Sequence, residues 1–164
     1  MERESTLIEV GAGVQLRPVA SHDLELLREW KNSNRERFFH REEITTEQQE
    51  AWFEEFLMRS NDHMFVVQVD GASVGCMGYR LGDDDIDFYN IIRGRSDSAP
   101  GVMHKALRCL IDVARATYPA RPVRVRVLSS NPAIEWYGMC GFVETVREAD
   151  HVVMTWRPTA PDLV

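Results

Sequence analysis

Three strand-like segments follow one another closely in the middle of the chain, and they constrain the fold more than any other feature. Residues 63–70 and 73–82 are joined by Asp70 and Gly71, a pair typical of tight β-hairpins. A second turn with glycine and aspartate leads into the strand at 83–92. Connections this short predict that the three strands are antiparallel neighbours.

A strong helical pattern at 102–118 separates this meander from another strand, at 123–128. A strand–helix–strand crossover favours a parallel pair, so the complete sheet is predicted to be mixed and covered by helices. The remaining elements are expected as a strand at 14–19, helices at 21–32 and 45–60 capped by Ser21 and Thr46, a helix from Pro132 to Cys140 and a last strand at 151–156. The predicted order is β-α-α-β-β-β-α-β-α-β, an α/β fold in one domain, 1–164.

The composition is that of an ordinary globular protein, with 44% hydrophobic residues, 27% charged residues and a net charge of −7. The acidic balance argues against nucleic-acid binding, and no apolar run is long enough for a membrane span. Without an apolar signal core at the N-terminus, we expect a cytoplasmic protein. Cys76, Cys109 and Cys140 fit reduced, packed thiols, and the histidine spacing predicts no metal site.

A polar loop, "RGRSDSAPG", lies between the strand ending near residue 92 and the helix that begins at about Val102. Such a loop directs backbone N–H groups and the positive helix end toward its ligand. Arg93, Arg95 and Lys105 add positive charge in a protein that is acidic as a whole. The loop therefore indicates a phosphate or diphosphate site, although glycine and proline before a helix are also routine punctuation.

The stretch "SSNPAIEWYGMCGF" follows the strand at 123–128 and carries Asn131 and Tyr137. Both residues are expected at the carboxyl end of the sheet, where α/β folds bind ligands. Asn131 is also a good helix cap before Pro132, and Tyr137 can equally be a core aromatic. Residue types and spacing leave both roles open.

Together with the element order, this stretch resembles the GNAT superfamily of acetyl-CoA-dependent N-acetyltransferases. Members commonly carry Asn-x-x-Ala-x-x-x-Tyr-x-x-x-Gly-Phe, which this stretch resembles through Asn131, Tyr137, Gly141 and Phe142; one residue fewer follows the asparagine here, so Ala133 falls one place early. The resemblance runs from about residue 14 to 156. The preceding loop departs from the superfamily's Arg/Gln-x-x-Gly-x-Gly/Ala pattern because its spacing is stretched.

The resemblance implies direct acetyl transfer from acetyl-CoA to a primary amine. Backbone groups of the strand at 88–92 are then expected to bind the pantetheine arm and polarise the thioester oxygen. Tyr137 is expected to give a proton or a hydrogen bond to the departing sulfur. The expected cofactor-binding residues are Ile91, Ile92, Arg93, Arg95, Gly101, Val102, Met103, Asn131 and Tyr137.

Deprotonation of the acceptor amine calls for a carboxylate, and Asp85 and Asp87 are the nearest ones to the position that some relatives use. Asp87 is the candidate base, with a structural role and a water relay as open alternatives. Other relatives carry a glutamate five residues before the asparagine, where this chain has Arg126. Asp87 is expected on the same strand face as Tyr89 and opposite Asn90.

The first two helices and the loop between them are expected to bind the acceptor through Trp30, Asn32, Arg35, Arg37 and Phe39. This region resembles the branch that acetylates nucleotide-linked amino sugars and the branch that acts on ribosomal-protein N-termini. Arginines beside aromatic rings suit a nucleotide, although apolar helix faces would also explain the aromatic residues. A small-molecule amine is the expected acceptor. Protein N-terminal or lysine acetylation and CoA binding without turnover are the alternatives, and both monomer and homodimer remain open.

Overall fold

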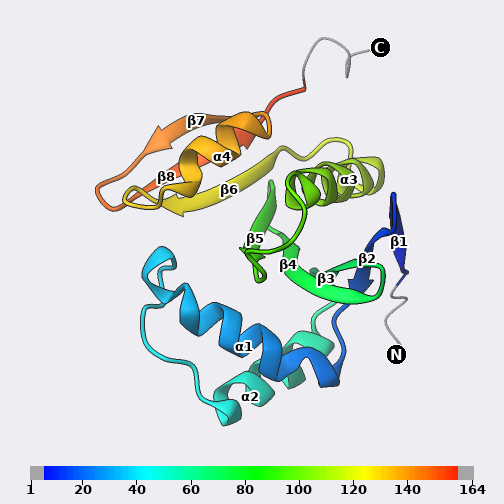
Figure 1. Cartoon of the computed structure of the whole chain (residues 1–164). Coiled ribbons are helices and arrows are strands. Elements are labelled where there is room, and N and C mark those ends of the chain that lie inside the picture. Colours follow the sequence, from blue (N-terminus) through cyan, green and yellow to red (C-terminus); the bar gives the residue numbers. More distant parts are fainter. Residues whose placement is uncertain (1–5, 159–164) are drawn as a thin grey trace.

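The computed structural model describes residues 6–158, and the outer ends of the predicted domain, 1–5 and 159–164, lie outside the described part. The described residues form one mixed sheet of order β1-β2-β3-β4-β5-β6-β8-β7 (Figure 1). Its strands are β1 (Ile8–Gly11), β2 (Val14–Pro18), β3 (Asp62–Val69), β4 (Ala72–Leu81), β5 (Ile86–Arg93), β6 (Val123–Leu128), β7 (Phe142–Arg147) and β8 (His151–Trp156). The helices are α1 (Leu24–Ser33), α2 (Thr46–Met58), α3 (Val102–Thr117) and α4 (Ala133–Met139).

The predicted strand pairing is confirmed in the centre of the sheet. β3, β4 and β5 form the antiparallel meander, and β5 pairs with β6 in parallel across the α3 crossover. At the β3–β4 turn, Asp70 and Gly71 have φ angles of 48° and 85°. Two successive positive φ values match the twist of the flanking strands, which explains why this dipeptide closes the hairpin.

Two strands, β1 and β7, were not predicted, and both lie at sheet edges. β1 has only four residues, too few for a clear alternation. In β7, Val143 and Val146 are each 46% exposed, and a bulge between Glu144 and Val146 breaks the two-residue period. Edge strands with exposed apolar residues and a broken period give little sequence signal.

Both predicted helix caps need correction. Ser21 begins a short 3-10 turn ahead of α1, and the Asp23 carboxylate closes that turn by accepting from a backbone N–H. Thr45, not Thr46, caps α2: its hydroxyl accepts from the N–H of Gln48, and the Gln48 side chain accepts from the N–H of Thr45. Adjacent threonines made the cap ambiguous by one residue.

Helices cover both faces of the sheet. On one face, α1 and α2 pack Leu27, Trp30 and Phe56 against a cluster that includes Val66 and Ile92. On the other face, α3 and α4 contribute to a larger core, whose members include Leu107, Leu110, Ile111, Tyr137, Phe88 and Val125. The sheet is therefore the middle of three layers, and segments far apart in sequence meet at its centre.

β5 and β6 separate part-way along their length. They pair only from Ile86 and Val123 to Phe88 and Val125, although both strands continue beyond those residues. From Tyr89 onward, the β5 edge that faces β6 has no strand partner. The sheet thus opens between its two halves, which leaves backbone hydrogen-bonding groups available on the inner edge.

A β-bulge in β5 lies at the beginning of this opening. Tyr89 pairs with Gly78 and Ile92 with Cys76, so β5 has one more residue than β4 between these pairs. Asn90, inside the bulge, has a φ of 50°. A bulge bends its strand and increases the local twist, which accounts for the divergence of β5 from β6. It also shifts the side-chain alternation, so Asn90 does not lie opposite Tyr89 as expected but hydrogen-bonds Lys31 of α1.

Gly94 lets α1 approach the end of β5, because a Cβ there would lie 2.1 Å from the Trp30 indole ring. Gly94→Ala is expected to lower the free energy of unfolding by about 1–3 kcal/mol through overpacking. Gly138→Ala is the control, since nothing lies within 4 Å of a Cβ at that position in α4. Chemical denaturation of both variants tests this; equal stability of Gly94→Ala and the wild type would contradict the packing described.

Candidate active site

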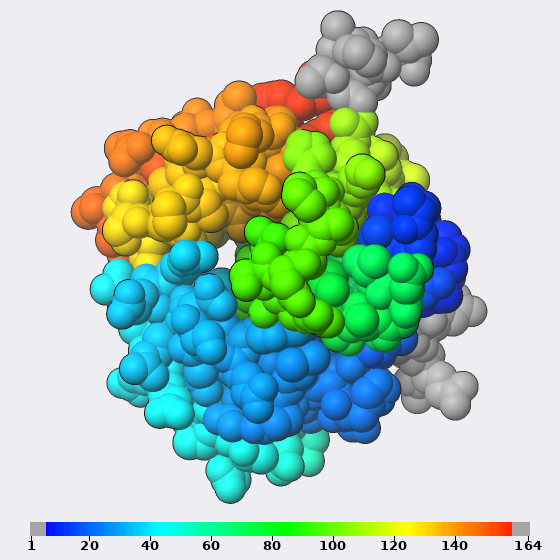
Figure 2. Space-filling view, in the orientation of Figure 1, coloured from blue at the N-terminus to red at the C-terminus, as the bar shows by residue number. Residues whose placement is uncertain are grey.

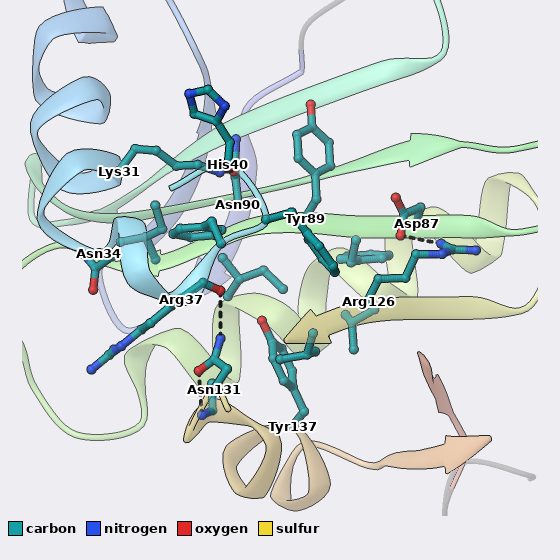
Figure 3. A pocket seen from close by; sticks show the side chains of 18 of the residues that line it. Lys31, Asn34, Arg37, His40, Asp87, Tyr89, Asn90, Arg126, Asn131 and Tyr137 are labelled. Carbon is teal, nitrogen blue, oxygen red and sulfur yellow. Dashed lines mark hydrogen bonds and ion pairs between the residues drawn. The ribbon is translucent and has the colours of Figure 1, made fainter. Parts of the chain in front are cut away.

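A cleft of about 400 Å³ occupies the space where β5 and β6 separate. Its walls come from α1, the α1–α2 loop, β5, β6 and α4 (Figure 3). Figure 2 shows a narrow opening between the segment near residue 35, the β6–α4 region and the end of β5. The cleft brings together eight of the predicted site residues: Arg37, Phe39, Asp87, Ile91, Ile92, Arg93, Asn131 and Tyr137.

Tyr137 points from α4 into the cleft with its hydroxyl toward the strands (Figure 3). Its ring is held edge-on against Trp136 and Phe142, and the residue is only 8% exposed. Burial raises the pKa of the Tyr137 phenol, and nearby Cys140 raises it further. The phenol therefore stays protonated at neutral pH. The ring belongs to the core, while the hydroxyl faces the cleft.

Asn131 bridges two segments at the end of the cleft. Its side-chain oxygen accepts from the N–H of Ala133 at 2.9 Å, which caps α4. Its side-chain nitrogen donates to the carbonyl of Arg37 at 3.3 Å, in the α1–α2 loop. Asn131 therefore has the capping role considered from sequence and also ties this loop to the second half of the sheet.

Asp87 lines the cleft but is bound to a cation. Its carboxylate lies 2.7 Å from Arg126, whose guanidinium also contacts the buried Asp85 at 2.9 Å. Burial raises the pKa of Asp87 and Arg126 opposes that effect; the net direction is upward. Some superfamily members carry a glutamate at the position of Arg126. In this chain the arginine instead neutralises the carboxylates of Asp85 and Asp87.

In the predicted phosphate loop, the two arginine side chains make contacts within the loop itself. Arg93 donates to the carbonyl oxygens of Ser96 and Ser98 and to the Ser98 hydroxyl, and Arg95 pairs with Asp97 at 2.7 Å. Both guanidinium groups thereby stabilise the loop. Only Arg93 of the two also lines the cleft.

The N-terminus of α3 is open. Gly101 precedes the helix with a φ of 82° and no side-chain cap, and a Cβ at this glycine would meet nothing within 4 Å. The side chains of Val102 and Met103 are buried, so these residues can offer a ligand only their backbone N–H groups, and the N–H of Val102 also makes a long contact of 3.4 Å with the Ala99 carbonyl. An uncapped helix start facing open space fits an anionic group.

Three predicted acceptor residues lie outside the cleft. Trp30 packs into the α1–sheet interface against Gly94. Asn32 uses its side-chain amide to hold both backbone groups of Ile44, at 2.8 and 3.0 Å. Arg35 lines a separate surface depression. Of the predicted acceptor residues, Arg37 and Phe39 remain in the cleft.

Several cleft residues were not assigned to the site from the sequence: Lys31, Asn34, His40, Asn90 and Arg126. A signal existed for two of them. Lys31 and Asn34 follow Leu27 by four and seven positions, on the same helical stripe as the core residue Trp30. Polar residues on a stripe that packs inward indicate a cavity or a partner.

The sequence model of the acetyltransferase (GNAT) domain matches residues 14–143. The chain belongs to the GNAT family of acetyltransferases. It is therefore an acyltransferase by reaction class, and the element order and the Asn131–Phe142 motif agree with that membership. No curated protein sequence matches the chain significantly.

Solved GNAT structures have the same fold. Apo FdhC, a nucleotide-linked sugar GNAT, superposes with a TM-score of 0.77 at 10% identity, over 93% of this chain and 90% of that one. RimL, a ribosomal L7/L12 alpha-N-protein acetyltransferase in complex with CoA, gives 0.76 at 12% identity, over 92% and 96%. Campylobacter jejuni PseH in complex with acetyl-CoA gives 0.68 at 15% identity, over 89% and 99%.

Two further findings concern the described part of the chain alone. None of its helices has the length and apolar character needed to cross a membrane. Between residues 6 and 158, no cluster of three or more histidine, cysteine, aspartate or glutamate side chains is arranged to hold a metal ion.

The Asp87–Arg126 contact generates a prediction about acidity. Arg126→Gln removes the cation that stabilises the ionised carboxylate, so the pKa of Asp87 should rise further, by roughly one pH unit. Carboxylate NMR of the two proteins measures this directly. Arg147→Gln, which breaks an exposed pair with Glu144 on β7, should leave Asp87 unchanged; an unchanged Asp87 in Arg126→Gln as well would contradict the pairing.

Proposed function

We propose that this acetyltransferase uses acetyl-CoA to acetylate a primary amine on a small molecule that bears anionic groups, such as a nucleotide-linked amino sugar. One observation carries the proposal: the Tyr137 hydroxyl faces a cleft whose opposite wall is the unpaired edge of β5. Family membership and the CoA-bound structures of similar fold support the choice of cofactor.

The cleft and the α3 N-terminus fit the parts of CoA. The pantetheine arm carries amide groups, which can hydrogen-bond a free strand edge as an added strand does. Ile91 and Ile92 supply the lining beside that edge. The backbone N–H groups of Val102 and Met103, opened by Gly101, would hold the diphosphate, with Arg93 shaping the loop beside it.

Tyr137 is proposed as the proton donor. Acetyl-CoA, when bound, supplies an acetyl group on a thioester. The neutral phenol of Tyr137 donates its proton, or a hydrogen bond, to the leaving sulfur. Because burial raises the phenol's pKa, Tyr137 remains in its donating form throughout the physiological range.

Asp87 is proposed to take the proton from the acceptor ammonium, directly or through water. Among the cleft-lining residues of the described chain, it is the one carboxylate. Burial raises its pKa and makes it a better proton acceptor, while Arg126 holds it on the β6 side.

The charge of the cleft supports an anionic acceptor. Lys31, Arg37, Arg93 and Arg126 line it, against the single carboxylate already noted. In a protein of net charge −7, this local excess of cations opposes polyamines and favours phosphate-bearing molecules. The likeness to FdhC points in the same direction, and the likeness to RimL keeps acetylation of a protein N-terminus as the second candidate.

A thiol-release assay tests the proposal. Acetyl-CoA is offered with a panel of amines: nucleotide-linked amino sugars, simple amino sugars, polyamines and peptides with free N-termini. The proposal expects CoA release with the nucleotide-linked sugars and none with polyamines. Release with peptides alone would favour the second candidate, and binding of acetyl-CoA without release for any amine would mark a protein that binds the cofactor without turnover.

Tyr137→Phe removes the proposed donor and leaves the ring that packs against Phe142. We expect kcat to fall roughly 100-fold or more, the scale of general-acid catalysis, while the affinity for CoA changes little. Stopped-flow thiol release and calorimetry measure the two quantities separately. A Tyr137→Phe enzyme with wild-type kcat would remove Tyr137 from the chemistry.

A further inference from the structure

A second cavity, also of about 400 Å³, lies between α1, α2 and β5. We call it the side cavity. It shares five lining residues with the cleft: Lys31, His40, Tyr89, Asn90 and Ile92. Its remaining wall is largely apolar and includes Leu27, Ile44 and Trp52. The five shared residues place the two cavities side by side around Lys31.

The side chain of Lys31 lies at the junction of these cavities and points from α1 toward β5 (Figure 3). Its ammonium donates to the side-chain oxygen of Asn90 and lies 3.6 Å from the centre of the Phe38 ring. Both contacts are with neutral groups. Burial lowers the pKa of Lys31 to about 8, and nearby Cys76 acts in the opposite direction.

Within residues 6–158, the contacts of the Lys31 ammonium include no ion pair. Among the residues lining the side cavity there is no carboxylate. The titratable and charged groups nearby are His40 of the α1–α2 loop, Cys76 of β4, Tyr89 of β5 and, across the cleft, Arg37, Asp87, Arg93, Arg126 and Tyr137. Burial raises the pKa of Cys76 to about 12, so its thiol is neutral.

Two carboxylates of the strands around this site, Asp87 and Asp62, are already bound. Asp87 pairs with Arg126, and Asp62, which accepts from the Tyr89 hydroxyl, pairs with Arg80 at 3.2 Å. A largely buried ammonium without a counter-charge is costly, and such groups are normally paired. An anionic ligand is the missing partner that this arrangement accommodates.

We propose that Lys31 binds an anionic group of the acceptor, a carboxylate or a phosphate, while the body of the acceptor occupies the side cavity and its amine faces the cleft. The inference rests on the proposed function, because the bound molecule is the acetyl acceptor. It adds that the acceptor carries an anion close to its reacting amine. Polyamines are thereby excluded by charge at the site itself.

The pH dependence of this binding has a definite sign. The anion binds the protonated form of Lys31, so affinity is full below the pKa of the free enzyme and falls as pH rises through about 8. Conversely, a bound anion stabilises the ammonium and raises the pKa of Lys31.

The direct test is the titration of Lys31 itself. The chain has two lysines, Lys31 and Lys105, so NMR of protein labelled with 13C at the lysine ε-carbon gives two titrating signals, which Lys105→Arg assigns. In CoA-saturated protein, inorganic phosphate is added in one arm and acetate in the other, with chloride at matched ionic strength as control. At least one anion should raise the pKa of Lys31 by roughly one pH unit, and the effective arm identifies the group.

If neither phosphate nor acetate moves the Lys31 titration, the proposal is overturned. Failure of CoA to bind is a different result, because it counts against the proposed function and not against the anion site. The pKa of Lys31 is then measured with and without the anions in the protein free of CoA. The Lys105 signal reports any anion that binds instead near the start of α3.

Three variants separate charge from packing. Lys31→Met keeps the length of the side chain and should weaken binding of the effective anion roughly 10- to 100-fold. The shift of the Asn90 backbone amide signal on titration with the anion measures this affinity. Lys31→Arg should retain it. Arg41→Met removes a cation from an exposed position that lines neither cavity and should also retain it. Wild-type anion affinity in a folded Lys31→Met protein contradicts the proposal; if that variant does not fold, the wild-type titration still decides.

Discussion

The structure depends on the limited pairing between β5 and β6. Three residue pairs hold the two halves of the sheet together, and beyond Phe88 and Val125 the strands part. The bulge at Asn90 bends β5 away, while Tyr137 and Phe142 pack beneath the other side of the gap. The loss of strand pairing leaves the β5 backbone without a strand partner at the cleft, whereas buried backbone groups are ordinarily paired. A ligand with amide groups of its own is therefore what this gap accommodates.

Charge is distributed unevenly around that gap. Several ion pairs of the described chain, such as Arg95–Asp97 and Arg147–Glu144, lie on the surface, where they contribute little, but Asp87 and Arg126 face one another inside the cleft. Lys31 has only neutral partners on the opposite side. One half of the cleft is thus internally compensated, whereas the other retains an unbalanced cation. The proposed division of roles follows: proton transfer beside Asp87 and Tyr137, and recognition of the acceptor beside Lys31.

Hydrophobic periodicity and turn chemistry were sufficient to predict the centre of the fold. Asp70 and Gly71 determine a hairpin locally, and the α3 stripe determines a crossover, so the mixed sheet could be derived from the sequence. The N-cap of α2, the edge strand β7 and the shift at Asn90 could not, because each depends on register or on solvent exposure. The site shows the same limit. The Asn131–Tyr137 motif was visible, but the partner of Asp87 lies 39 residues away on another strand. Trp30 and Asn32 were assigned to the acceptor because the first two helices resemble the acceptor-binding region of related branches, and tertiary packing gives both residues structural roles.

A crystal structure of the complex with CoA decides whether the opening between β5 and β6 holds the cofactor. We expect the pantetheine arm along β5, between that strand and β6 and past Phe88 and Val125, with the sulfur beside the Tyr137 hydroxyl and the diphosphate at the start of α3. A gap that is closed, or filled by the protein's own side chains with CoA bound elsewhere, would contradict this expectation.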